Sequence, residues 1–232
     1  MKFKNKRVII LDMVKIMLGC ECMKIKEPKI NTEFEECSDI TNIIYDEDKV
    51  YSKSFNNIEI SDKNFRNVEF DNCIFNNVKF INTNLSKVTL MDSKFINCDF
   101  SNNDMTEDII YRVEFINCRL VGTDFASSTM KDVKFENCNA KYINLSSVKI
   151  SSSILKSSDF ELGYMNECML KDLELDESNF NEVEFAKTPL KDIDFRTCSI
   201  EGIKLTGTEL KGAIVTDFQA LSLSKLLGII IK

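Results

Sequence analysis

The sequence predicts a solenoid of short internal repeats, and three observations support this fold class. An apolar residue recurs at every fifth position from Phe55 to Val215, and Ala140 is the only one of these 33 positions that is not Phe, Leu, Ile, Met or Val. Fourteen of the 17 Phe residues fall in this register. A second column, two positions earlier, holds small or β-branched residues such as Cys98 and Val113. An α-helix has a period of about 3.6 and a strand a period of about 2, so this pattern indicates a stacked repeat.

Residues 51–215 form the repeat region, and their pattern resembles that of the pentapeptide-repeat family. Each unit offers one large and one small inward side chain, with mostly Asn, Asp, Glu, Lys or Ser between them. The resemblance implies an all-β fold, a right-handed quadrilateral β-helix of about eight coils with about twenty residues in each. Strands of adjacent coils would stack at about 4.8 Å, so residues twenty apart should touch. We expect two such ladders, one of Cys98, Cys118 and Cys138 and one of Phe75, Phe95, Phe115 and Phe135.

Residues 1–50 precede the repeats and are expected to form a short helix and an acidic connector. Residues 1–30 carry eight Lys or Arg and three acids, a net charge of +5. We expect a helix from about residue 6 to residue 18. Export is the alternative, because basic residues precede the apolar segment 8–18, but Asp12 and Lys15 interrupt that segment. Residues 31–50 hold seven acids and a single base, Lys49.

Residues 216–232 are expected to form a dimerisation helix and a strand. Thr216 or Asp217 can cap the start of a helix, and Gly228 can end it in a left-handed conformation. The helix has two apolar sides, which suggests that one covers its own solenoid and the other a partner; a monomeric end cap is the alternative. Residues 229–231 are a strand available for edge pairing. The residues expected at the dimer interface are Phe218, Leu221, Leu223, Leu226, Leu227 and Ile229.

The C-terminal end further resembles the Qnr quinolone-resistance branch of the same family. The similar stretches are 194–210 and 218–229, together with Ala140 after Cys138 and Asn139. The resemblance implies a homodimer joined through the C-terminal helix, forming a rod that imitates B-DNA, binds DNA gyrase or topoisomerase IV and protects them from quinolones. It implies neither direct nucleic-acid binding nor a membrane. The long N-terminus departs from that branch, and its surface loops are nearly absent; the best remnant is segment 101–111, where Asn103 and Asp108 replace the small inward residue.

The composition excludes several kinds of function. The chain has no His, which removes His-based catalysis and His metal ligation, and we expect no enzyme activity, no cofactor and no metal. Cys20 and Cys22 form a lone Cys-x-Cys without a partner cluster. Cys73, Cys98, Cys118, Cys138, Cys168 and Cys198 all fall in the small inward column. Buried reduced thiols favour a cytoplasmic protein.

The charge of the chain points to a basic protein partner. Residues 31–232 carry a net charge of −12. Residues 58–217, sorted into four faces by their place in the twenty-residue coil, sum to 0 and −2 on the faces of Phe65 and Phe70, and to −3 and −4 on the adjoining faces of Phe75 and Phe80. We expect the shared edge of the last two faces to bind the topoisomerase; the alternative is an interaction scaffold for another protein partner. The candidate contact residues are Asp159, Glu161, Glu174, Asp176, Glu177, Glu182, Asp194 and Glu201, with Asp104 and Glu107 from segment 101–111.

Overall fold

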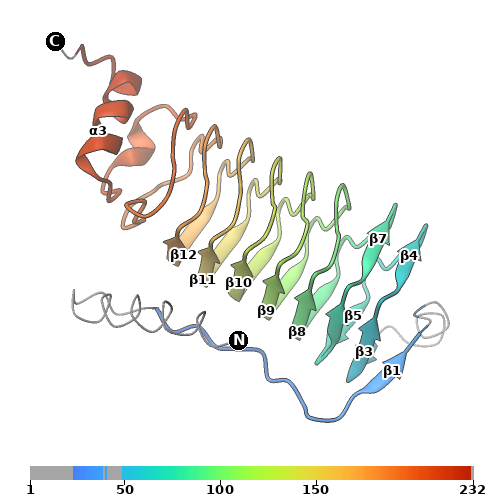
Figure 1. The fold of residues 1–232 in the computed structure, drawn as a ribbon. Helices are drawn as coiled ribbons and strands as arrows, with labels where there is room; N and C mark the ends of the chain where they lie inside the picture. The colour runs from blue at the N-terminus through green and yellow to red at the C-terminus, as the bar shows by residue number, and fades with distance from the viewer. Residues whose placement is uncertain (1–22, 39, 41–48, 231–232) are drawn as a thin grey trace, which may run out of the picture.

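Parallel pairing at a constant offset of twenty residues builds the fold. Phe95 is paired with Phe115, and Phe115 with Phe135, as the five-residue register predicts. The computed structural model describes residues 23–38, 40 and 49–230, and there the chain forms a β-solenoid of about seven turns (Figure 1), close to the eight expected. The strands are β1 (Glu35–Cys37), β2 (Lys49–Tyr51), β3 (Lys53–Asn56), β4 (Glu59–Ser61), β5 (Glu69–Asp71), β6 (Ile74–Asn76), β7 (Lys79–Ile81), β8 (Thr89–Ile96), β9 (Ile109–Ile116), β10 (Thr129–Glu136), β11 (Lys149–Lys156) and β12 (Met169–Asp176).

Every strand pair is parallel, and most strands join one sheet along the axis. In that sheet the order is β1-β3-β6-β8-β9-β10-β11-β12, with β2 and β5 beside them, whereas β4 and β7 form a separate pair. The other sides of the coils are held by single bridges, such as that between Asn84 and Asp104. The expected helix over residues 6–18 lies outside the described residues.

The chain turns at corners where φ is positive, and these corners recur every five residues from Ser52 to Asp192. Most L-residues avoid this left-handed region, while Asn, Asp and Gly tolerate it. Asn occupies many corners, for example Asn97 with φ of 56° and Asn117 with φ of 55°. Gly122 fills another corner with φ of 67°. The corners explain why so few glycines suffice for so many turns.

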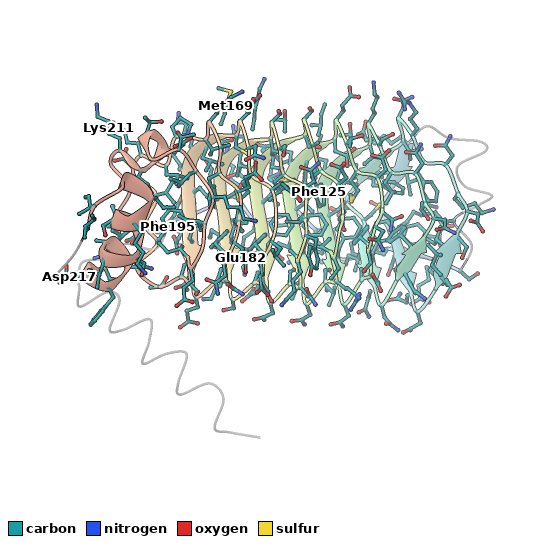
Figure 2. All side chains as sticks on the ribbon, turned by 90° about the horizontal axis from the view of Figure 1, so that it is seen from above. Phe125, Met169, Glu182, Phe195, Lys211 and Asp217 are labelled. Carbon is teal, nitrogen blue, oxygen red and sulfur yellow. The ribbon has the colours of Figure 1, made fainter. Side chains whose placement is uncertain are left out.

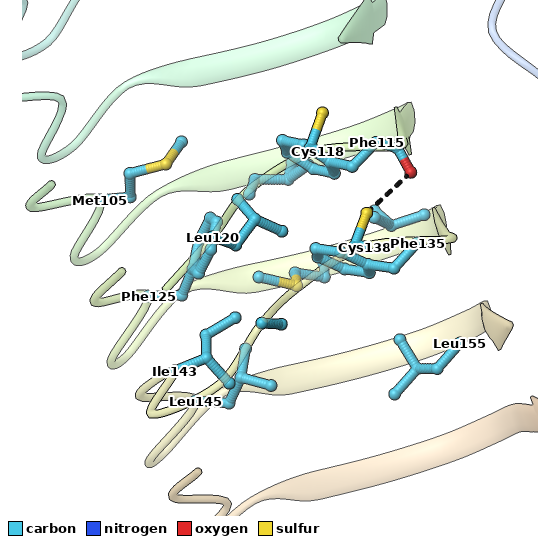
Figure 3. Close-up of a cluster of buried hydrophobic side chains, with 14 of the residues drawn as sticks. Met105, Phe115, Cys118, Leu120, Phe125, Phe135, Cys138, Ile143, Leu145 and Leu155 are labelled. Atoms are coloured by element: carbon cyan, nitrogen blue, oxygen red, sulfur yellow. Dashed lines mark hydrogen bonds between the residues drawn. The ribbon is translucent and has the colours of Figure 1, made fainter. Parts of the chain in front are cut away.

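The large inward side chains stack in ladders along the axis. The ring centroids of Phe95 and Phe115 are 5.1 Å apart, and those of Phe115 and Phe135 are 4.9 Å apart, with the rings within 10° of parallel. Figure 3 shows this part of the core, where Phe115 and Phe135 lie beside the two thiols of the small column. Full burial of one such ring stabilises the fold by roughly 1.5–3 kcal/mol. The ladder therefore supplies a continuous core without any enclosing helix.

The polar members of the small inward column are hydrogen-bonded to the backbone. Cys138 Sγ donates to the Phe115 carbonyl at 3.3 Å (Figure 3), and Thr123 Oγ1 donates to the Phe100 carbonyl at 2.9 Å. Each donor reaches back to the preceding coil, so a Cys, Ser, Thr or Asn fits the column and leaves no buried hydroxyl or thiol unpaired. The six cysteines expected there are buried, as predicted, and they form no disulfide.

A short helical cap covers the C-terminal end of the solenoid. A 3₁₀ turn, η1 (Thr208–Leu210), precedes helix α3 (Asp217–Leu223), which continues as the 3₁₀ helix η2 (Ser224–Leu227). Thr216 caps α3 through a reciprocal pair of hydrogen bonds with Gln219, and Gly228 follows η2 with φ of 71°, as predicted. The Gln219 amide donates to the carbonyls of Phe195 and Cys198 at 2.8 and 2.9 Å, which anchors the cap to the last coil.

Candidate interaction surface

Two of the predicted acids, Asp159 and Glu161, lie on the Phe80 face and share one base. Lys141 Nζ is 3.3 Å from Asp159 Oδ2, and it also pairs with Glu161. Asp159 further accepts a hydrogen bond from the Asn179 amide at 2.9 Å. Both carboxylates are half-buried, so the local ion pairs offset part of the charge expected here.

Three more predicted acids are engaged within the chain. Arg196 Nη2 lies 2.6 Å from Asp194 Oδ2, and this contact lowers the pKa of Asp194. Asp176 is only 5% exposed, and Lys156 Nζ of the preceding coil lies 3.6 Å away. The expectation that Asp176 lies on the outer surface is therefore wrong. Glu174 Oε2 accepts a hydrogen bond from the backbone N–H of Met23 at 2.7 Å.

The remaining acids near the C-terminal end are exposed: Glu177, Glu182 and Glu201. None of the three forms an ion pair with a described residue. Glu177 and Glu182 occupy successive left-handed corners, with φ of 49° and 57°, and therefore bound one face of the coil. The Glu182 N–H donates to the Glu201 carbonyl at 2.7 Å, which places these two residues on adjacent coils. We call these three residues the acidic end.

Segment 101–111 is a regular part of one coil and has no protruding loop. Asp104 bridges to the coils on both sides, and Asn103 and Asp108 are buried in the inward column. Asp104 and Glu107 are exposed, as a contact role requires, although Lys87 Nζ pairs with Glu107 Oε2 at 3.0 Å. Burial raises the pKa of Asp108 to about 9, and its Oδ2 atom has no hydrogen-bond partner among the described residues.

The cap divides the predicted dimer residues into two groups. Leu223 is 7% exposed and belongs to the core, so its side chain covers its own solenoid and is not available to a partner. Phe218 is 85% exposed, and Leu221, Leu226 and Ile229 are also exposed. Residues 229–230 form no strand, and the side chain of Leu227 lies outside the described residues. Figure 2 shows α3 over the end of the rod next to Phe195.

An N-terminal strap is the main feature that sequence reasoning missed. Residues 23–31, the strap, run along the row of β-strands (Figure 1), with one tight turn at Lys29 that the Ile30 N–H closes by donating to the Pro28 carbonyl at 3.0 Å. Their backbone N–H groups donate to four side chains from separate coils: Met23 to Glu174 at 2.7 Å, Lys26 to Asp132 at 3.0 Å, Lys29 to Asp92 at 2.9 Å and Asn31 to Asn72 at 2.9 Å.

Three of the four acceptors share one corner of the coil. Asn72, Asp92 and Asp132 all follow the Phe70 column by two residues, and Glu174 lies two residues further along its own coil. Arg112 occupies the same corner between Asp92 and Asp132 and pairs with Asp92. Asn72, Asp92, Asp132 and Asp172 recur at this corner in the sequence, but Arg112 and Ser152 interrupt the column, so the pattern alone does not single it out as a row of acceptors.

Comparisons with known proteins agree with the repeat architecture. Residues 88–162 match the family model of the pentapeptide repeat region, and residues 64–102 match that of pentapeptide repeats in eight copies. The two matches together show that residues 64–162 consist of pentapeptide repeats. No curated protein matches the chain.

Several solved structures are similar to this chain. QnrB1, a plasmid-mediated fluoroquinolone resistance protein, is 22% identical in a trypsin-treated form, covering 79% of this chain and 90% of that chain with a TM-score of 0.42. The full-length QnrB1 structure is 17% identical and covers 76% of this chain and 100% of that chain, with a TM-score of 0.44. HetL, from the cyanobacterium Nostoc and involved in heterocyst differentiation regulation, is 13% identical and covers 72% and 91%, with a TM-score of 0.28.

The described part of the chain contains neither a metal site nor a helix that could span a membrane. No group of three or more His, Cys, Asp or Glu side chains there could hold a metal ion. None of the helices in these residues has the length and apolar character needed to cross a lipid bilayer.

Proposed function

We propose that the chain is a DNA mimic that binds type II topoisomerases, DNA gyrase or topoisomerase IV, and protects them from quinolones. The observation that carries the proposal is the acidic end, where three exposed carboxylates without an ion-pair partner among the described residues lie on adjoining coils. A DNA-binding surface is basic, so these carboxylates would be attracted to it over a Debye length of about 8–10 Å. Because the C-terminal sequence resembles the Qnr branch, we infer that the partner with this basic surface is a topoisomerase.

The dimensions of the rod support the same proposal. Seven coils at about 4.8 Å each give a length of about 34 Å, close to one helical turn of B-DNA. B-DNA of that length carries about 20 phosphate charges, whereas residues 31–232 carry a net charge of −12. The proposed mimicry is therefore one of shape with about 60% of the charge, and the acidic end offers three exposed carboxylates without an ion-pair partner among the described residues.

Dimerisation is part of the proposal, and the uncovered side of the cap supports it. Phe218 and Leu221 are exposed on the helix that faces away from the solenoid, and Leu226 and Ile229 extend the apolar surface. Two copies joined at their caps would form a rod of about twice the length, with two acidic ends near its centre. Phe218→Asp should give monomers in sedimentation while circular dichroism keeps the signal of the solenoid, because this side chain is 85% exposed in the single chain. A dimer of unchanged affinity would exclude this side of the cap as the interface.

A supercoiling assay with purified gyrase and a fluoroquinolone tests the proposed function. The wild-type chain should restore supercoiling in the presence of the drug. Glu177→Lys, Glu182→Lys and Glu201→Lys together should abolish protection and capture of gyrase or topoisomerase IV, while circular dichroism stays unchanged.

The matched control reverses three exposed acids at the other end of the solenoid, Glu36, Glu59 and Asp62, to Lys. This variant has the same total charge, so retained protection would assign the effect to location. Equal loss in both variants would mean that only bulk charge matters. If the wild-type chain neither binds nor protects a topoisomerase, the alternative of a scaffold for another protein takes the place of this proposal.

A further inference from the structure

The strap has the geometry of a bound peptide. Four of its hydrogen bonds to the solenoid come from backbone N–H groups, while Lys24, Lys26 and Lys29 extend into solvent. The Asn31 side chain adds longer bonds to the Tyr51 and Ser52 hydroxyls at 3.4 and 3.3 Å. Met23, Ile25, Pro28 and Ile30 are half-buried against the coils. Recognition of an extended backbone by regularly placed acceptors is how proteins bind peptides along a sheet or groove.

The spacing of the strap matches the spacing of the coils. Asp92 and Asp132 are two coils apart, about 9.6 Å at the usual distance between strands. Three residues of extended chain, from Lys26 to Lys29, span about 10 Å. The same three-residue step leads from Lys26 to Met23 while the acceptor moves two coils, from Asp132 to Glu174. From Met23 to Lys29, a donor on every third residue therefore meets an acceptor on every second coil. The last step, from Lys29 to Asn31, covers two residues and one coil.

The side chain of Arg112, which lies at this corner of the coil, cannot accept a hydrogen bond, and the strap offers no donor bond to it. Arg112 stands between Asp92 and Asp132 and is a donor only. The strap residues between the two donors Lys26 and Lys29 are Glu27, an acid, and Pro28, which has no N–H. Pro28 therefore presents no N–H in the stretch of the strap between the donors to Asp132 and Asp92, where the corner carries Arg112 in place of an acceptor.

We propose that this corner of the solenoid is a binding site for an extended peptide, and that residues 23–31 are its intramolecular occupant. Asp132 shows that the site is built for a ligand, because it is only 4% exposed and Oδ2 has no hydrogen-bond partner among the described residues, although Oδ1 accepts from Lys26. The site takes an extended peptide whose N–H donors are spaced as in the strap, with apolar side chains at the positions of Ile25, Pro28 and Ile30 against the coils. A partner with such a segment would have to displace the strap.

The first test is amide hydrogen exchange in the full chain. The N–H groups of Lys26, Lys29 and Asn31 should exchange at least tenfold more slowly than those of Lys24 and Glu27, which donate no hydrogen bond to the described coils. Uniform exchange over residues 23–31 would overturn the proposal.

The second test vacates the site and refills it from solution. Lys26→Pro with Lys29→Pro removes two of the donors, and Lys24→Pro with Lys29→Ala is the control of equal charge that keeps both backbone N–H groups. The probe is a fluorescent synthetic peptide of residues 23–31, followed by anisotropy. It should bind the double-proline variant at least tenfold more tightly than the wild type or the control, because the tethered strap competes at high effective concentration.

A peptide N-methylated at Lys26 and Lys29 should not bind the double-proline variant. Equal binding to wild type and variant, or binding to neither, would overturn the proposal, as would equal binding of the N-methylated peptide. No topoisomerase enters these experiments, so the proposal can fail or succeed independently of the proposed function.

Discussion

Asp108 is a carboxyl group buried at a position where its neighbours in the column carry neutral side chains. The Val88 N–H donates to Oδ1 at 2.9 Å, but burial outweighs this bond and raises the pKa of Asp108 from its usual 3.8 to about 9. The folded chain therefore holds Asp108 protonated at neutral pH, while the unfolded chain releases the proton. As the pH rises above about 4, each unit removes about 1.4 kcal/mol of stability until the folded-state pKa is reached. Between pH 4 and pH 7 the loss is about 4 kcal/mol.

Asp108→Asn should remove this pH dependence and stabilise the fold at pH 7. Asn103, five residues earlier in the same column, shows how the amide fits: its Oδ1 accepts from the Thr83 N–H at 3.1 Å and its Nδ2 donates to the Phe80 carbonyl at 3.0 Å. An amide at position 108 can make the equivalent pair of bonds with the preceding coil. The Asn side chain is neutral and makes both hydrogen bonds, so folding does not have to bury a carboxylate at position 108.

Urea unfolding at pH 4.5, 6.0 and 7.5 measures the effect. The free energy of unfolding of the wild type should fall relative to that of Asp108→Asn by about 1.4 kcal/mol per pH unit. Asp104→Asn is the control, because Asp104 is an exposed aspartate on the same coil and the substitution is the same chemical change. Its curve should run parallel to that of the wild type. If the Asp108→Asn curve is also parallel to the wild type, Asp108 is ionised in the folded chain and the reasoning fails.

Three other predictions concern the ladders and corners. Phe115→Ala should lower the free energy of unfolding by about 3–5 kcal/mol, because it breaks the ring stack, whereas Lys131→Ala on the surface should change it by less than about 0.5 kcal/mol; similar losses in urea titrations would contradict the ladder. Leu162→Asn should raise the melting temperature, since Leu162 has φ of 60° and Asn tolerates this region at lower cost; a lower value would show that its side-chain contacts matter more than its backbone. Burial raises the pKa of Cys73 to about 12 and that of Cys168 to about 11, so both thiols should resist a disulfide reagent at pH 8 until urea unfolds the chain; fast labelling of the native chain would contradict this.

The repeat could be predicted from sequence because one physical requirement acts at every fifth position. A side chain that points inward must be apolar or must satisfy its own hydrogen bonds, so Phe115 and Cys138 follow from position alone. Gly228 and Thr216 were predictable for a similar local reason, since backbone conformation at a helix end restricts the residue type.

The surface was less predictable because charge pairing depends on neighbours twenty residues away and on the reach of long side chains. Lys141 beside Asp159 and Lys156 beside Asp176 come from different coils, and a sum over faces does not show which acids remain exposed. The strap was not predictable, because its contacts join residues up to 151 apart in sequence through backbone groups that carry no residue-specific signal.

The strap also changes how this stack of coils can come apart. In a linear repeat protein each coil contacts only its two neighbours, so an end can fray while the rest stays folded. Here one short segment is bonded to coils from Asn72 to Glu174 at the same time. If the coil that holds Glu174 unfolds, the strap loses one anchor and its bonds to Asp132 and Asp92 are weakened. If the coil that holds Asn72 unfolds, the strap loses its anchor at the opposite end, and the same two bonds are weakened. The strap therefore couples the unfolding of coils that do not touch one another. It gives a fold whose coils otherwise contact only their neighbours a long-range source of cooperativity.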